Sequence, residues 1–135
     1  MKSYTKMKQE DKQLLLVDLC ARLPYGVKCL VNFKGTKYTM TLKTGLPNSF
    51  GNWDFYNEKY SLCSNDFKPY LRPMSSMTLE ELEEYRRFSD HIRDAECKIH
   101  IANYKQIDWL NAHHFDYRGL IEKGLAIEAP EGMYN

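Results

Sequence analysis

Residues 27–43 form the most constrained segment of the 135-residue sequence. Apolar and polar residues alternate along both halves of this segment, and a period of two is typical of strands that bury one face. Gly35-Thr36, between the halves, suits a two-residue turn with glycine first. That turn would set Phe33 opposite Tyr38, and every apolar residue would then face another across the pair. The other expected pairs are Val31 with Met40 and Cys29 with Leu42.

Two later segments are expected to extend this hairpin into an antiparallel meander. Residues 53–63 alternate less cleanly, which predicts a third strand with a bulge or break near Asn57. Pro69 and Pro73 hold the residues between them extended, because each proline fixes its own φ and restricts the residue before it. Since proline is tolerated at a sheet edge, a short edge strand around Tyr70-Leu71 would bring the sheet to three or four strands.

Helical periodicity precedes and follows the predicted sheet. Residues from about 10 to 22 have apolar side chains four apart on one face, and Pro24 is expected to end that helix. A second helix is expected to begin at Thr78, which has capping-box spacing with Glu81. This helix should run to about Asp90, because its apolar side continues to that point.

Shorter elements are expected toward the C-terminus. Residues 95–102 alternate in a way that favours a strand but leaves a helix open. Asn103 is a suitable cap for a helix over residues 104–114. Asp116 is a suitable cap for a short helix that Gly124 would end.

These elements predict a single α+β domain spanning residues 1–135. Its parts are an N-terminal helix, an antiparallel meander of three to four strands seeded by the hairpin 27–43, and C-terminal helices packed on the sheet. A chain of this length with 43% hydrophobic residues can bury one sizeable core. The polar ends, residues 1–8 and 128–135, are expected to be loosely ordered.

Charge and cysteine content bound the class of function. Nineteen basic and 18 acidic side chains give a formal net charge of +1, which gives no support to a strongly nucleic-acid-binding or anionic-membrane-binding surface. The N-terminal charges are followed by no apolar leader, and the longest apolar run near that end is too short to span a bilayer. Widely spaced cysteines fit free thiols in a reducing compartment. We therefore expect a cytoplasmic protein without membrane contact.

Catalytic and metal-binding signatures are weak. The sequence contains no Gly-x-Ser-x-Gly, no glycine-rich phosphate loop and no His-Glu-x-x-His motif. The one metal-like grouping joins Cys97 and His100 to His113-His114, and adjacent histidines on a helix diverge rather than converge on one ion. We therefore predict no enzyme activity, no catalytic residue, no metal site and no cofactor.

Nucleic-acid binding is the second function class that the sequence leaves open. Lysines on the polar face of the hairpin, with Trp53 and Phe55 nearby, would hold a single strand by charge and stacking. Alternatively, the helix pair 104–123 would act as a helix-turn-helix, although its second helix offers few basic side chains. The lysines concerned are Lys28, Lys34, Lys37 and Lys43.

A protein-binding surface is expected around Tyr70, Arg72, Trp109 and His113. Tyrosine, tryptophan and arginine most often dominate binding energy. The prolines flanking Tyr70 and Arg72 lower the entropy cost of presenting them. Trp109 and His113 are four residues apart at the edge of an apolar helix stripe. The alternative is that Trp109 completes the core and that Arg72 pairs with a nearby acid such as Glu80.

Three stretches of the sequence carry a family resemblance. They are LLLVDLCARLPYGV at residues 14–27, FKPYLRPMSSMT at residues 67–78, and DWL with HFDYRGLIEKGLAI at residues 108–110 and 114–127. These stretches resemble a group of small uncharacterised proteins from gut-anaerobe genomes, their phages and mobile elements. The resemblance implies a phage or mobile-element accessory protein and brings no established activity with it. Because catalytic motifs are absent, we expect a non-enzymatic protein-binding module whose partner is a host or phage protein.

Overall fold

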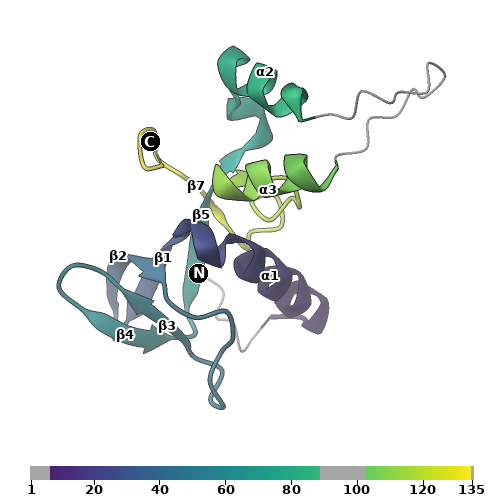
Figure 1. Cartoon of the computed structure of the whole chain (residues 1–135). Coiled ribbons are helices and arrows are strands. Elements are labelled where there is room, and N and C mark those ends of the chain that lie inside the picture. Colours follow the sequence, from purple (N-terminus) through teal and green to yellow (C-terminus); the bar gives the residue numbers. More distant parts are fainter. Residues whose placement is uncertain (1–6, 89–102, 135) are drawn as a thin grey trace.

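The computed structural model describes residues 7–88 and 103–134. Figure 1 shows a mixed α+β fold, with an N-terminal helix, a sheet and later helices, so the predicted fold class is confirmed. The helices are α1 (Gln9–Arg22), α2 (Leu79–Arg87) and α3 (Tyr104–Ala112), with short 3-10 turns η2 (Leu23–Tyr25) and η3 (Met74–Ser76). The strands are β1 (Lys28–Phe33), β2 (Thr36–Leu42), β3 (Trp53–Tyr56), β4 (Ser61–Ser64), β5 (Phe67–Pro73), β6 (Phe115–Asp116) and β7 (Ile127–Glu128).

The sheet is larger than the three to four strands predicted. Within the described ranges it has seven strands in the order β4-β3-β2-β1-β5-β6, and β7 also pairs with β5. β1 to β4 form an antiparallel meander, whereas β5 pairs with β1 although β4 precedes it in the chain. The single strand expected over residues 53–63 is a hairpin, because the Asn57 side chain accepts hydrogen bonds from the Lys59 and Tyr60 amides and turns the chain.

β5 is an interior strand rather than the edge strand expected around Tyr70-Leu71. β1 pairs with its first residues, and the two-residue strands β7 and β6 pair in parallel with its later ones. The Asn32 amide donates to the Asp66 carbonyl, so hydrogen-bonded pairs between β1 and β5 recur every second residue from that point. Pro69 falls between two such pairs, and its missing N–H therefore removes no bond to β1.

The hairpin of β1 and β2 forms as predicted, but its register is shifted by two residues. Lys34 and Gly35 both have positive φ, 52° and 83°, so they make the turn in place of the Gly35-Thr36 expected. Phe33 consequently lies opposite Thr36 rather than Tyr38. Because the shift is even, every side chain keeps the face that the alternation predicts.

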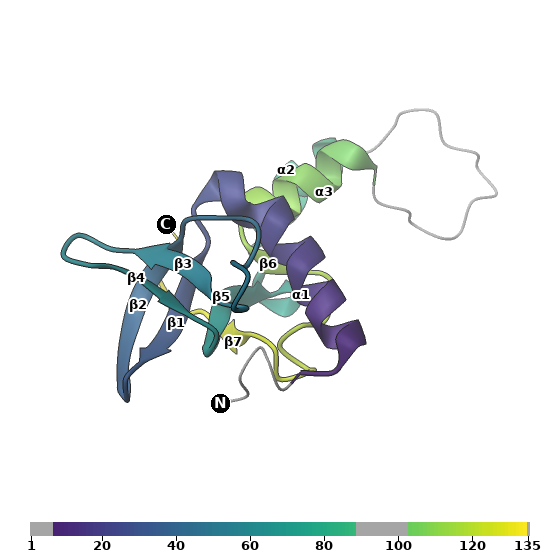
Figure 2. The ribbon, with the colours of Figure 1, turned by 90° about the horizontal axis from the view of Figure 1, so that it is seen from below.

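The main core lies between α1 and the inner face of the sheet, and Figure 2 shows α1 lying beside the strands. Leu15 and Leu19 of α1 are fully buried there. The ring of Phe67 meets those of Trp53 and Phe55 at centroid distances of 5.8 and 4.9 Å. α1 therefore covers the apolar face on which the C-terminal helices were expected.

α2 and α3 build a second apolar cluster beside the edge strand β6, whereas they were expected on the main apolar face of the sheet. Figure 1 shows both helices beyond the end of β5; they pack on one another, and α3 also packs on β6 and α1. Thr78 begins α2 with the expected capping box, and Asn103 caps α3 as expected. α2 ends at Arg87, and residues 95–102 lie outside the described part of the chain. The buried members of this cluster are Tyr85, Trp109, Leu110 and Phe115.

Residues 117–124 form a series of turns rather than the short helix predicted. Asp116 is therefore not a helix cap: its two carboxylate oxygens accept hydrogen bonds from the Leu120 and Ile121 amides, four and five residues ahead, and close a wider turn. Gly124, with a φ of 76°, ends this run of turns. The helix pair expected over residues 104–123 is therefore not formed.

The C-terminal tail is held against the sheet, although its polar sequence predicts loose order. The Ala129 amide donates to the Leu71 carbonyl at 2.7 Å. The pairing of β1 with β5 stops one residue short of Lys28 and Tyr70. There the Tyr134 hydroxyl accepts a hydrogen bond from the Lys28 amide at 2.9 Å and donates one to the Tyr70 carbonyl at 2.7 Å. A side-chain hydroxyl thus completes the strand pair.

We expect Tyr134→Phe to lower the free energy of unfolding by about 1–3 kcal/mol, because the Lys28 amide and the Tyr70 carbonyl lose their shared partner. Urea denaturation followed by circular dichroism measures the change. Tyr104→Phe is the matched control, since that side chain is 72% exposed, and it should cost less than about 0.5 kcal/mol. Equal effects of the two substitutions would mean that Tyr134 makes no stabilising hydrogen bond.

Candidate functional site

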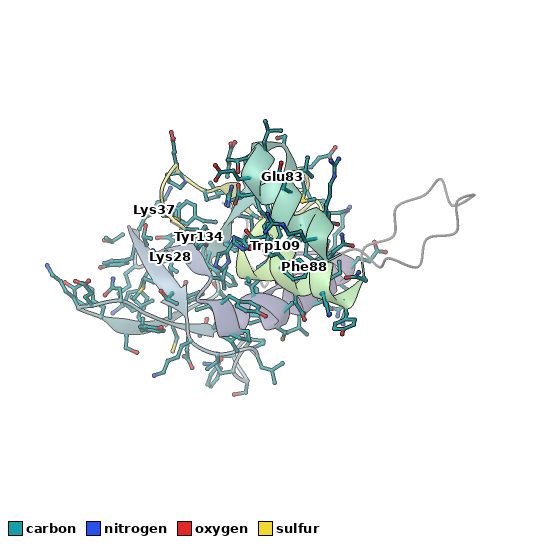
Figure 3. All side chains as sticks on the ribbon, turned by 45° about the horizontal axis from the view of Figure 1, so that its top comes forward. Lys28, Lys37, Glu83, Phe88, Trp109 and Tyr134 are labelled. Atoms are coloured by element: carbon teal, nitrogen blue, oxygen red, sulfur yellow. The ribbon has the colours of Figure 1, made fainter. Side chains whose placement is uncertain are left out.

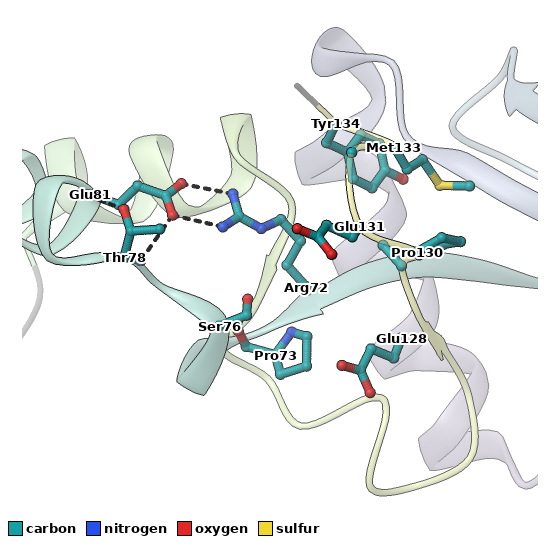
Figure 4. A pocket seen from close by; sticks show the side chains of 12 residues that line it. Arg72, Pro73, Ser76, Thr78, Glu81, Glu128, Pro130, Glu131, Met133 and Tyr134 are labelled. Carbon is teal, nitrogen blue, oxygen red and sulfur yellow. Dashed lines mark hydrogen bonds and ion pairs between the residues drawn. The ribbon is translucent and has the colours of Figure 1, made fainter.

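A cleft of about 510 Å³ lies beside the C-terminal end of β5, at Arg72 and Pro73. One wall consists of the end of β5, η3 and the start of α2, and the other wall is the C-terminal tail. Figure 4 shows the Arg72–Glu81 ion pair on the first wall, with the Glu128 and Glu131 side chains on the tail. The volume is within the range of ligand-binding clefts in proteins.

Arg72 is held from three directions. Its two terminal nitrogens each donate to one carboxylate oxygen of Glu81, both at 2.7 Å, which is the bidentate geometry that arginine favours. Its guanidinium carbon lies 4.1 Å from the centre of the Phe115 ring, and its backbone amide donates to the His114 carbonyl at 2.8 Å. Arg72 therefore forms an ion pair with a nearby acid, which was the alternative to a binding role, and the acid is Glu81 rather than Glu80.

The same ion pair changes the acidity of Glu81. The hydrogen bonds from Arg72 lower the pKa of this carboxyl from 4.5 to about 2, and the backbone amide of Thr78 adds to the effect. Burial opposes the shift but does not outweigh it. Glu81 is consequently ionised at neutral pH and serves α2 as a cap and β5 as an ion-pair partner.

Tyr134, which lines the cleft, is fixed by a buried histidine. The His114 ring stacks on the Tyr134 ring at 3.8 Å, and its Nε2 donates to the Tyr25 carbonyl at 3.1 Å. Burial and the nearby Arg22 charge lower the pKa of His114 from 6.5 to about 4. The imidazole is therefore neutral at pH 7, and the stability it contributes declines as the pH falls from about 6.5 toward 4.

Trp109 belongs to the second apolar cluster rather than to the surface. Its side chain is 6% exposed, and Figure 3 labels it where α2 and α3 meet. The Trp109 ring lies 5.7 Å from that of Tyr85 and stacks on Phe115 at 5.6 Å and 14°. The His113 ring also lies against it, with ring centroids 4.2 Å apart. The structure thus places Trp109 and Arg72 against Phe115, with His113 against Trp109, but it does not present the tryptophan to a partner.

The remaining predicted site residue, Tyr70, is half-buried on β5, and its carbonyl accepts a hydrogen bond from the Tyr134 hydroxyl. Of the four predicted residues, Arg72 alone lines the cleft. The acidic tail residues Glu128 and Glu131 were missed, because a polar segment of this kind carries no periodicity. The one available sequence sign was Tyr134, an aromatic residue in an otherwise polar tail that needs a partner for its ring.

The basic sheet face predicted for nucleic acid is also changed by the structure. Trp53 and Phe55 are fully buried in the main core, so neither ring is open to a base. Tyr56 follows Phe55 on β3 and pairs with Thr41 on β2, so both residues project from the outer face, opposite the core. The predicted combination of hairpin lysines with these two buried rings is therefore wrong.

Metal and membrane signatures can be checked only within residues 7–88 and 103–134. No group of three or more His, Cys, Asp or Glu side chains in that part of the chain is placed to hold a metal ion. Cys97 and His100 lie outside it. His113 and His114 diverge, since one ring stacks on Trp109 and the other on Tyr134. None of the described helices combines the length and apolar character that a bilayer crossing requires.

A scan against protein-family models, a search of curated proteins and a search of solved structures each found no match to this chain.

Glu81→Gln separates the ion pair from the helix cap, because glutamine still completes a capping box with Thr78. Since the pKa of Glu81 is about 2 in the folded protein and 4.5 ordinarily, its stabilising effect is present above pH 4.5 and is lost as the pH falls toward 2. We expect the variant to be less stable by about 1–3 kcal/mol at neutral pH. The difference should shrink through the acid window in urea denaturation at successive pH values.

Glu84→Gln, an exposed change on the same helix, is the control and should leave the unfolding curve nearly unchanged at every pH. A difference between wild type and Glu81→Gln that stays constant down to the acid limit would contradict the ion pair.

Trp109→Ala should lower the free energy of unfolding by about 3–5 kcal/mol, because it leaves a cavity between Tyr85 and Phe115. Tyr104→Ala removes an aromatic side chain from the exposed side of the same helix and should cost less than about 1 kcal/mol. Thermal and urea denaturation compare the two variants. If the Trp109→Ala protein were as stable as the Tyr104→Ala protein, the buried position of Trp109 would be contradicted.

Proposed function

We propose that this protein is a non-enzymatic protein-binding module that takes a lysine- or arginine-rich segment of a host or phage protein into the cleft between β5 and the tail. The observation that carries the proposal is the charge of the cleft, which has one arginine against three glutamates. Arg72 is neutralised by Glu81. Within the described residues Glu128 and Glu131 make no ion pair, so their carboxylates are available to a cationic partner.

Both walls of the cleft are formed before a partner arrives. The two arms of Arg72 are already engaged, and Tyr134 ties the tail to β1 and β5. A site of this kind loses little conformational entropy on binding, which favours affinity. Met133 adds a flexible apolar side chain to the lining, suited to the methylene stems of lysine and arginine.

The setting comes from the sequence resemblance rather than from the cleft. An accessory protein of a phage or mobile element, acting in the cytoplasm, would meet host and phage proteins there. Opposite charge at the cleft would steer such a partner and fix its register, while wrong partners carrying acidic segments would be repelled. Arg72 acts in this proposal as support for the cleft wall, because its donors are taken by Glu81.

Fluorescence anisotropy with two labelled peptides of equal length, one rich in lysine and arginine and one rich in glutamate, tests the proposal. We expect the basic peptide to bind with an affinity that falls as salt is added, and the acidic peptide not to bind. Glu128→Gln/Glu131→Gln should weaken binding of the basic peptide by about 10-fold or more, because both free carboxylates are removed.

Glu83→Gln/Glu84→Gln makes the same change of net charge on the exposed side of α2 and is the matched control. Equal loss of affinity in the two double variants would show general electrostatic attraction without a site. Full affinity in Glu128→Gln/Glu131→Gln would exclude the cleft as the binding site.

A further inference from the structure

The outer face of the sheet, away from α1, carries a row of side chains at one register position. Directly paired residues on neighbouring strands project from the same face and are about 5 Å apart. The row therefore crosses β1, β2, β3 and β4 without interruption. In strand order its members are Lys28, Thr41, Tyr56 and Ser61.

Two clefts meet at Tyr56. One of about 570 Å³ extends from Tyr56 toward Lys28, and the other, of about 500 Å³, extends toward Lys43 and Tyr60. Tyr56 is 45% exposed, so its ring is open to stacking. An extended chain can pass over Tyr56 from one cleft into the other, because both clefts also share the turn that follows it.

Positive charge dominates these two clefts. Lys28, Lys43 and Lys59 line them against one carboxylate, that of Glu58. The Lys28 ammonium donates one hydrogen bond to the Met133 carbonyl at 3.3 Å, and Figure 3 labels Lys28 close to Tyr134 of the tail. Aromatic rings between lysines are the combination with which proteins hold a single strand without reading its sequence.

The tip of the β3–β4 hairpin is fixed in place. The Asn57 side-chain oxygen accepts hydrogen bonds from the Lys59 and Tyr60 amides at 2.9 and 2.7 Å, and the Asn57 amide donates back to the Tyr60 carbonyl. The Tyr60 ring meets that of Tyr38 edge-on at 5.6 Å. Because Tyr38 lies on the core side of β2, this contact turns the Tyr60 ring away from the outer face and leaves Tyr56 as the exposed ring there, on a rigid frame that lowers the entropy cost of stacking a base.

We propose that this face binds single-stranded nucleic acid, with a base stacked on Tyr56 and backbone phosphates against Lys28, Lys43 and Lys59. The surface is separate from the acidic cleft, carries the opposite charge and does not depend on the function proposed for that cleft. It keeps Lys28 and Lys43 of the basic face expected from the sequence, and Tyr56 takes the place of the two aromatic members of that face that are buried.

The test is fluorescence anisotropy of the full chain with four labelled probes at about 50 and about 200 mM salt. The probes are a mixed-sequence single-stranded DNA, the matching single-stranded RNA, the DNA duplex and a glutamate-rich peptide. We expect both single strands to bind more tightly than the duplex, with affinity that falls as salt rises. The peptide should not bind, because it offers charge without bases to stack.

Substitutions at Tyr56 separate stacking from charge. Tyr56→Ala should weaken single-strand binding by about 5-fold or more, and Tyr56→Phe should retain it, because the ring rather than the hydroxyl carries the contact. Tyr104→Ala, an exposed aromatic change on α3, should leave affinity unchanged. Lys43→Gln/Lys59→Gln keeps the ring and should reduce the slope of log affinity against log salt by about 1.4.

Absence of single-strand binding at low salt would overturn the proposal. So would equal affinity for single strand and duplex that is insensitive to Tyr56→Ala, since that result describes non-specific attraction. Tight binding of the glutamate-rich peptide that depends on Tyr56 would assign the face to an acidic protein segment instead. If Tyr56→Ala proves unfolded by circular dichroism, an unchanged salt slope in Lys43→Gln/Lys59→Gln contradicts the proposal independently.

Discussion

The pairing of β5 determines how the rest of the molecule is assembled. A strand inside a sheet must satisfy backbone groups along both of its edges, and no single partner does so here. β1 pairs with residues 67–69, and the Tyr134 hydroxyl donates a hydrogen bond to the Tyr70 carbonyl. Further along β5, β7 pairs with residues 70–71 and β6 pairs with residues 72–73. Three separate parts of the C-terminal chain are thus brought onto one strand, and the acidic cleft forms where that strand leaves the sheet.

A buried network of charges joins α1 to the same C-terminal segments. Asp18 and Arg22, neither of them exposed, pair at 2.9 Å, and Arg22 also donates to the Phe115 carbonyl at 2.6 Å. Arg118 donates to the second oxygen of Asp18 at 2.7 Å. Sharing one carboxylate between two guanidinium groups offsets part of the desolvation cost, and removing Asp18 would leave the buried Arg22 charge without an ion-pair partner. α1 thereby fixes β6, on which Arg72 packs.

Sequence reasoning succeeds where local chemistry decides and fails where distant partners decide. Alternation gives the faces of β1 and β2, and the Thr78 capping box begins α2, because both depend on near neighbours. β6 and β7 are two residues long and have no periodicity, so they can be recognised only beside the open edge of β5. The candidate cleft could be predicted only in part for the same reason. Arg72 was predicted as a site residue, but Glu81 and the acidic tail come close to Arg72 only in the folded chain. Trp109 sits at the edge of an apolar stripe, where the sequence cannot separate core from surface, and its stack on Phe115 places it in the core.

If the tail is a fixed part of the fold that completes the sheet and walls the cleft, the Lys28 amide reports it most directly, because the Tyr134 hydroxyl accepts its hydrogen bond. Amide hydrogen exchange followed by NMR measures this. We predict that Lys28 exchanges about as slowly as Leu42, whose amide donates to the Val27 carbonyl inside the sheet. Exchange at Lys28 as fast as at Glu58 in the exposed turn would show that the tail does not dock, and it would contradict both the completed strand pair and the preformed cleft.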